Sequence, residues 1–108
     1  MADNKFKFSS SKNKNYLVIT LEGHFDFTAW ASNSKKLESL LVGSDKILID
    51  ASRLSYLSSG GLGFLISIYH HTSKTGGDVK IAGLKKSLHE ILIKTGYDKL
   101  FEFIDSIE

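Results

Sequence analysis

From Asp26 onward, stretches with helical periodicity alternate with short apolar runs, and this order constrains the fold of the chain more than any other feature. The clearest apolar run lies between Lys46 and Asp50, where Ile-Leu-Ile is uninterrupted, as expected of an interior strand covered on both faces. Such alternation is typical of α/β domains, in which the crossovers between parallel strands are right-handed. The sequence therefore predicts an α/β fold in which helices pack against a mixed sheet of about four to five strands.

The N-terminal part of the chain predicts two strands. Phe6 and Phe8 alternate with lysines, and the segment from Tyr16 to Leu21 is rich in β-branched and aromatic residues. The polar segment from Ser9 to Asn15 predicts a turn between them, and Gly23 is expected to end the second strand. The two strands are therefore expected to pair with each other.

Three helices are expected in the rest of the chain. Asp26 or Thr28 can cap the first, the second runs from near Ser59 to about Lys74, and the third stops at Gly96. Helical spacing places apolar side chains on shared faces of these helices. They are Trp30, Leu37, Leu40 and Leu41 in the first helix; Leu62, Leu65, Ile66 and Tyr69 in the second, with Phe64 and Ile68 on another face; and Leu84, Leu88, Ile91 and Leu92 in the third.

Composition excludes several classes of protein. The chain has no cysteine, which removes disulfides, thiolate metal sites and cysteine nucleophiles. A net charge of +2 with scattered lysines argues against direct nucleic-acid binding. No stretch approaches the roughly 18 apolar residues of a membrane span, and the first residues lack the apolar core of a signal peptide. A cytoplasmic protein is therefore expected.

Small residues are concentrated from Ser55 to Gly63, in Ser-Tyr-Leu-Ser-Ser-Gly-Gly-Leu-Gly. The glycines are too close together for a Walker loop, and no lysine follows them. A nucleophile elbow needs glycine two residues before the serine, where Ser58 and Ser59 have Tyr56 and Leu57 instead. The histidines also lack metal-ligand spacing. Neither a cofactor nor a metal is therefore expected.

Two interpretations of the adjacent serines remain. One serine can cap the helix, a role that we assign to Ser58, because its hydroxyl can accept a hydrogen bond from a free backbone N–H. Gly60 and Gly61 remove side chains beside Ser59, which favours a hydroxyl open to a partner's active site. A phosphate there would add a charge of about −1.5 to −2 at a helix N-terminus, where the helix dipole tolerates it. These properties favour an interaction site over a cap alone.

Several short motifs follow one another along nearly the whole chain. They are Gly23-His24-Phe25-Asp26, the hydrophobic strand ending in Asp50, Leu54 to Leu57 before the serines, Gly76-Gly77 before a strand, and Thr95-Gly96-Tyr97 before Leu100-Phe101. In this order and spacing the chain resembles STAS-domain proteins, in particular bacterial anti-sigma factor antagonists. The resemblance implies one STAS-like domain over residues 1–108, without enzymatic activity of its own.

In that family the serine segment usually reads Asp-Ser-Ser-Gly-Leu-Gly, and a partner anti-sigma kinase phosphorylates the serine after the Asp. Here Ser58 stands at the Asp position, Ser59 at the phosphoacceptor and Gly60 at the following serine; if the register shifts by one, Ser58 is the acceptor. The resemblance implies binding to an anti-sigma factor/serine kinase, release of a sigma factor, inactivation by phosphorylation at Ser59, and reset by a phosphatase of the PP2C type. The expected partner-binding residues are Asp26, Tyr56, Leu57, Ser58, Ser59, Gly60, Gly61 and Leu62. Phe25 and Phe27, beside Asp26, are candidates for the same contact surface, but a place in the core is favoured for both.

The departure from the family motif leaves alternatives open. Because Ser58 replaces the usual Asp, the chain can also be a STAS interaction subunit that is not phosphorylated, in a scaffold or a lipid-transport ATPase assembly. A small serine hydrolase that uses Ser58 or Ser59 is the alternative from another class.

Overall fold

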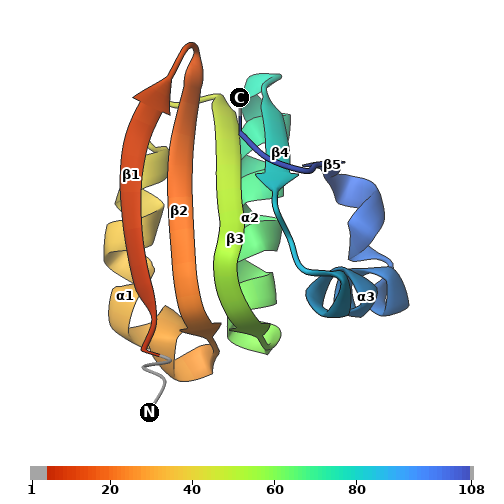
Figure 1. Cartoon of the computed structure of the whole chain (residues 1–108). Helices are drawn as coiled ribbons and strands as arrows, with labels where there is room; N and C mark the ends of the chain where they lie inside the picture. Colours follow the sequence, from red (N-terminus) through yellow and green to blue (C-terminus); the bar gives the residue numbers. More distant parts are fainter. Residues whose placement is uncertain (1–4, 108) are drawn as a thin grey trace.

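The computed structural model describes residues 5–107, which form one sheet with helices packed against it (Figure 1). The sheet has five strands in the order β1-β2-β3-β4-β5; β1 is antiparallel to β2 and the other neighbours are parallel, which confirms the predicted mixed sheet. The strands are β1 (Lys7–Asn13), β2 (Tyr16–Phe25), β3 (Lys46–Leu57), β4 (Asp78–Ala82) and β5 (Glu102–Ile104), and the helices are α1 (Phe27–Leu41), α2 (Ser59–Thr75), α3 (Lys86–Thr95) and the 3-10 turn η1 (Tyr97–Leu100).

The first strand is longer than its polar sequence suggests. The prediction of a turn from Ser9 to Asn15 is wrong, because only Lys14 and Asn15 form the turn and seven residue pairs join β1 to β2 without irregularity. Lys14 adopts a φ of +57°, as tight two-residue hairpin turns require. Serines are stable in β1 because β2 supplies their backbone partners and the sheet edge leaves their side chains in water.

The second strand also continues past its expected end. Gly23 has a φ of +82°, and β2 runs beyond it to Phe25. The pairing of β2 with β3 shifts register next to Gly23, so the glycine accommodates a bulge and does not end the strand. The extension places Phe25 in the core and brings Asp26 to the start of α1.

The helices cover one face of the sheet, with α1 and α2 behind it in the view of Figure 1. Buried side chains from β2, β3, α1 and α2 form the main core between these layers. Of the two apolar faces predicted for α2, the one with Phe64 and Ile68 is buried, together with Leu65, whereas Leu62 and Tyr69 of the other face are only partly so. Two sides of α2 are apolar, and packing against both α1 and the sheet selects the one that carries Phe64 and Ile68.

The other face of the sheet has a smaller apolar cluster. Ile47 and Ile49 face the helices, whereas Leu48 packs with Val18 and Ala82 on the opposite side. Strand β3 is therefore buried on both faces, as predicted, but within residues 5–107 no helix covers the face that carries Leu48. Tyr16 and the C-terminal side chains Ile104 and Ile107 pack on that cluster.

A polar group of side chains lies beside this second cluster. The Tyr16 hydroxyl donates a hydrogen bond to the Asp78 carboxylate, and the Lys80 ammonium lies 5.4 Å from the centroid of the Tyr16 ring. The hydrogen bond to Asp78, together with partial burial, raises the pKa of Tyr16 above its ordinary value of 10.0. The folded protein therefore holds this phenol proton more tightly than the unfolded chain does.

Because of this raised pKa, the stabilisation that protonated Tyr16 gives the folded protein is expected to be lost at alkaline pH. Its contribution is fully present below pH about 10 and is lost as the pH rises through the raised pKa, because only the unfolded chain has released the proton in that interval. Tyr16→Phe is expected to flatten the alkaline fall in the free energy of unfolding, measured by urea denaturation at a series of pH values. Tyr97→Phe, at an exposed tyrosine, is the control and should keep the wild-type slope. An unchanged slope in Tyr16→Phe would contradict the assignment.

Candidate functional site

The candidate site lies at the edge of the sheet where β2 and β3 end and helices α1 and α2 begin (Figure 1). In open α/β sheets, functional groups gather outside the carboxyl ends of the strands. Two chain junctions meet at this edge. The β2–α1 junction comprises residues 24–27, and the serine junction between β3 and α2 comprises residues 56–62.

The two junctions are in direct contact through backbone and glycines. The Ser58 N–H donates a hydrogen bond to the Phe25 carbonyl at 3.1 Å. A Cβ added to Gly60 would lie 2.6 Å from the Phe27 Cα, and one added to Gly61 would lie 2.6 Å from the Phe25 carbonyl oxygen. The prediction that these glycines clear space around Ser59 is therefore wrong: both are buried, and they allow α2 to start directly against the β2–α1 junction.

The open space beside Ser59 has a different origin. Ser59 is the first residue of α2 and is exposed, and Gly63 is exposed one helical turn later. A Cβ added to Gly63 would have no heavy atom within 4 Å. Because residues four apart lie on the same side of a helix, Gly63 leaves the surface beside Ser59 flat. The sequence shows the four-residue spacing between Ser59 and Gly63, but the prediction assigned the open space beside Ser59 to Gly60 and Gly61 instead.

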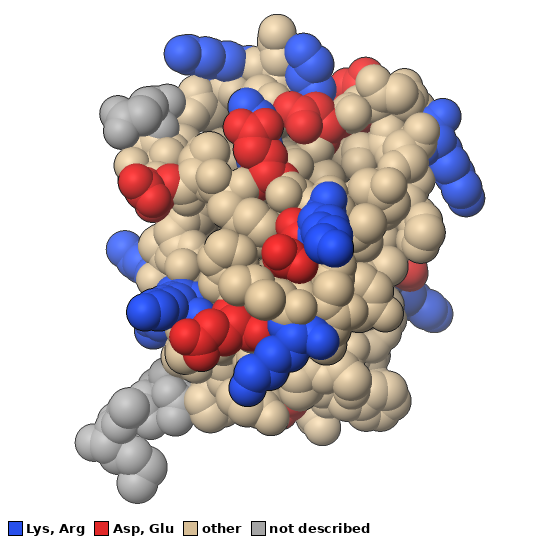
Figure 2. Space-filling model, turned by 90° about the vertical axis from the view of Figure 1, so that its right-hand side faces the viewer, with Lys and Arg blue, Asp and Glu red and all other residues tan. Residues whose placement is uncertain are grey.

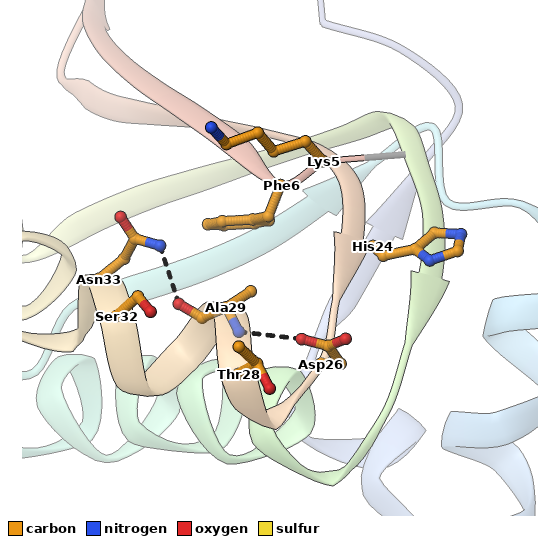
Figure 3. Close-up of a pocket in the computed structure, with 8 residues that line it drawn as sticks. All are labelled: Lys5, Phe6, His24, Asp26, Thr28, Ala29, Ser32 and Asn33. Carbon is orange, nitrogen blue, oxygen red and sulfur yellow. Dashed lines mark hydrogen bonds between the residues drawn. The ribbon is translucent and has the colours of Figure 1, made fainter. Parts of the chain in front are cut away.

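The two helices that begin here are capped differently. Asp26, at the N-cap of α1, accepts a hydrogen bond from the Ala29 N–H at 2.9 Å (Figure 3). Ser58 occupies the N-cap position of α2 with extended backbone angles, but its side chain makes no capping hydrogen bond. The prediction that Ser58 caps α2 is thus confirmed for its position at the N-cap, but it is wrong about the hydroxyl, which makes no capping hydrogen bond. The free N–H groups in the first turn of α2 therefore have no side-chain acceptor from the N-cap.

A matched pair of substitutions tests this difference. Asp26→Ala is expected to lower the free energy of unfolding by about 1 kcal/mol, because it removes a capping bond that the structure contains. Ser58→Ala should change it by less than about 0.5 kcal/mol, and Ser58→Asp should raise it by about 0.5–1 kcal/mol by supplying a charged cap. Urea denaturation measures all three. Equal losses for the two alanine variants would mean that the Ser58 hydroxyl caps α2 in solution.

Aromatic side chains flank the serine junction. Phe25 is fully buried as expected, but Phe27 is 66% exposed, so its assignment to the core is wrong. The reason is that helix α1 begins at Phe27 and turns its first side chain away from the sheet. Tyr56 is 45% exposed, and its ring centroid lies 5.2 Å from that of His24 on the neighbouring strand. Exposed aromatic side chains of this kind are enriched in protein interfaces.

The other predicted partner-binding residues divide by exposure. Ser59 and Tyr56 are exposed, whereas Asp26, Ser58 and Leu62 are half-buried. Leu57, Gly60 and Gly61 are buried and position their neighbours. The structure therefore brings all of the predicted residues together at one edge. It exposes Phe27 there, which the sequence had left as a candidate for the contact surface, and it adds Gly63, which the sequence interpretation did not select.

The histidines of the described residues make their contacts away from the two serines. Within residues 5–107, no histidine is hydrogen-bonded to Ser58 or Ser59, so a Ser–His pair of the hydrolase type does not form there. His71 instead contacts the Ser44 carbonyl oxygen at 2.6 Å, near the C-terminal end of α2. In that same part of the chain, no group of three or more His, Cys, Asp or Glu residues could hold a metal ion, and no helix has the length and apolar character needed to cross a membrane.

Comparison with known proteins gives a consistent result. The STAS domain model matches residues 7–108. BtrV of Bordetella bronchiseptica, a candidate anti-sigma factor antagonist, is 24% identical over 107 residues, covering 94% of this chain and 89% of BtrV. An anti-sigma factor antagonist from Mycobacterium paratuberculosis has a TM-score of 0.84 at 19% identity, with 98% of this chain and 91% of that chain covered.

A third similar protein is known in two states. The anti-sigma factor antagonist SpoIIAA in its unphosphorylated form has a TM-score of 0.77 at 18% identity, covering 96% of this chain and 90% of that chain. The phosphorylated form of SpoIIAA, from Bacillus, has a TM-score of 0.72 at 18% identity, covering 96% and 93%. The solved structures match the five-stranded mixed sheet and its helices, and the family model extends over almost the whole sequence. The chain therefore belongs to the STAS domain family.

Proposed function

We propose that this protein is an anti-sigma factor antagonist whose binding is switched off by phosphorylation of Ser59. The observation that carries the proposal is the exposed hydroxyl of Ser59, at the first residue of α2 and next to the flat surface at Gly63. Exposed Phe27 and Tyr56 extend the same edge with apolar surface. The unmodified protein binds an anti-sigma factor/serine kinase through this edge, and binding releases the sigma factor.

The position of Ser59 allows modification without unfolding. A phosphate at the first residue of α2 carries a charge of about −1.5 to −2 and lies near the positive end of the helix dipole. The uncapped N–H groups of the first turn are further favourable partners for its oxygens. The charge is unfavourable in the complex, because a dianion must lose its water or face unpaired acceptors when a partner covers it. Phosphorylation therefore ends binding while the fold remains.

A cycle of phosphorylation and dephosphorylation requires two partner enzymes. The kinase transfers a phosphoryl group from ATP to the Ser59 oxygen, and a phosphatase of the PP2C type hydrolyses the phosphoserine and restores binding. SpoIIAA, which is similar in fold, is known in both phosphorylated and unphosphorylated forms, and this supports the proposal. The cycle takes place in the cytoplasm, where ATP and sigma factors are present, and the protein itself catalyses no step.

The test is phosphorylation by a purified anti-sigma factor/serine kinase from the same organism. After incubation with ATP and Mg²⁺, intact-mass measurement is expected to show one added phosphate, and peptide mapping is expected to place it on Ser59. Ser58→Ala should still be modified, and Ser59→Ala should not. A phosphate on Ser58 would show that the loop register is shifted by one.

The second candidate is a STAS subunit that binds its partner constitutively in a scaffold or a lipid-transport ATPase assembly. The presence of Ser58 where the family motif has Asp favours it. The two functions differ in one outcome, because a constitutive subunit binds its partner and receives no phosphate on either serine.

A further inference from the structure

The outer edge of β1 forms a second surface, separate from the serine junction. β1 is the first strand in the sheet order, and no other element of residues 5–107 pairs with its outer side. The two-residue turn makes Asn13 and Tyr16 the closing hydrogen-bonded pair, and such pairs alternate along an antiparallel ladder. Phe8, Ser10 and Lys12 therefore direct their backbone N–H and C=O groups outward. This regular edge can accept another strand.

Charge determines what kind of strand fits. Lys5, Lys7, Lys12 and Lys14 are all exposed on or next to β1. Glu22, the cross-strand neighbour of Lys7, is already 3.8 Å from the guanidinium of Arg53. Acidic and basic side chains are interspersed on the opposite flank of the molecule (Figure 2). Lysines along an edge disfavour pairing with a second copy of the same basic strand, and they favour a negatively charged segment.

A recess of about 320 Å³ lies at the N-terminal end of this edge (Figure 3). Phe6 forms one wall, and its ring stacks on that of Phe25 with 4.3 Å between the centroids. Ser32 and Asn33 of α1 form the opposite wall, and Lys5 lies at the rim. The Asn33 amide uses one of its N–H groups on the Ala29 carbonyl at 2.8 Å, which leaves the other able to donate. Hydroxyl, amide and ammonium groups therefore border the recess on the side of Ser32, Asn33 and Lys5. The Asp26 carboxylate, which accepts the Ala29 N–H, also lines the recess, so an acidic side chain fits only at the end bordered by Ser32 and Asn33.

We propose that β1 binds an extended acidic segment of a partner protein as a sixth strand, with one glutamate or aspartate side chain in the recess. Backbone hydrogen bonds to Phe8, Ser10 and Lys12 hold the segment, and the recess selects one of its side chains. The carboxylate accepts hydrogen bonds from the Ser32 hydroxyl and the Asn33 amide. This surface does not include Ser59, so binding there requires no particular phosphorylation state, and Asp26 is the residue that it shares with the candidate site.

The test uses an acetylated and amidated heptapeptide of alternating glutamate and valine as the probe. In an NMR titration of the isotope-labelled protein, the backbone amides of Phe8, Ser10 and Lys12 are expected to shift and to exchange more slowly with solvent. Binding should weaken as salt is added, because the lysines are exposed. A peptide with lysine in place of glutamate should not bind. Equal binding of both peptides, shifts confined to other residues, or no binding at millimolar peptide would overturn the proposal.

Two pairs of variants separate the edge from the recess. Ser10→Pro removes an outward N–H without removing a bond to β2, so it should weaken peptide binding about fivefold relative to Ser10→Ala. Ser32→Glu places a negative charge at the recess and should weaken binding about fivefold relative to Ser32→Gln. Lys12→Glu provides an edge variant that retains the backbone if Ser10→Pro disturbs the sheet. Unchanged affinity in Lys12→Glu and Ser32→Glu would contradict the proposal, whatever the outcome of the kinase experiment.

Discussion

Gly60→Ala is expected to lower the free energy of unfolding by about 2–3 kcal/mol and the Tm by roughly 10–20 °C. The added Cβ would lie 2.6 Å from the Phe27 Cα, 2.9 Å from the Phe27 nitrogen and 3.0 Å from the Asp26 carbonyl oxygen. These are backbone atoms, so no side-chain rotation relieves the overlap, and α1 and α2 must move apart. The better helix propensity of alanine offsets about 1 kcal/mol of this cost. Thermal and urea denaturation measure the change.

Gly63→Ala is the matched control in the same helix. Gly63 is exposed, no heavy atom lies within 4 Å of its added Cβ, and its φ is not in the left-handed region. Alanine should therefore raise the free energy of unfolding by about 0.5–1 kcal/mol through helix propensity alone. If both variants changed stability by the same amount, the close approach of α2 to the β2–α1 junction would not exist in solution.

Ser59→Asp is expected to weaken binding to the anti-sigma factor/serine kinase by about thirtyfold, or about 2 kcal/mol, while Ser59→Ala keeps wild-type affinity. The carboxylate introduces a permanent negative charge at the exposed start of α2, where the proposed interface must exclude water. Isothermal titration calorimetry with the purified kinase measures both affinities. In the presence of ATP, the wild-type complex should dissociate with time and the Ser59→Ala complex should persist.

Stability measurements on the same variants distinguish a binding effect from unfolding. Ser59 is exposed, and an acidic residue in the first turn of a helix is favourable, so neither variant should lose stability. Ser58→Ala serves as the neighbouring control for affinity. If Ser59→Asp and Ser59→Ala bound the kinase equally well, the phosphorylation switch would be refuted, although the fold assignment would stand.

The contact between the two junctions has a consequence for this switch. The Ser58 N–H bond to Phe25 and the buried glycines tie the start of α2 rigidly to the start of α1. A charge added at Ser59 therefore changes the surface chemistry of a fixed edge. In the proposed switch, binding is therefore controlled by electrostatics at the interface, and the fold needs no second conformation.

Much of the architecture was predictable from the sequence because local patterns and the fold agree. The apolar run at residues 47–49 predicted a buried strand, and small residues after Leu57 predicted the start of α2 at Ser59, where the structure has it. Asp26 was one of two predicted caps and makes the capping bond. These features depend on neighbours in the chain, through backbone periodicity and short-range hydrogen bonds, so they are visible without tertiary structure.

The wrong predictions concern features that do not depend on neighbours in the chain. Ser9 to Asn13 has the composition of a turn, yet it is a strand because β2 supplies its backbone partners. Phe27 is as apolar as Phe25, but the direction of the first turn of α1 leaves it exposed. In both cases the outcome depends on residues that are brought near only when the sheet and helices assemble.

By itself the sequence determined the order of strands and helices as far as the third helix, the position of the serines at the start of α2, and the likeness to STAS proteins. It left the last element open between a strand and a helical turn, and the structure has η1 followed by β5. Only the tertiary structure decided which glycine serves which purpose. Gly60 and Gly61 face another backbone, whereas Gly63 faces solvent, and no local pattern distinguishes these directions. The physical reason is that a glycine's role depends on what its missing side chain would touch, and these contacts form only when α1 and α2 pack together.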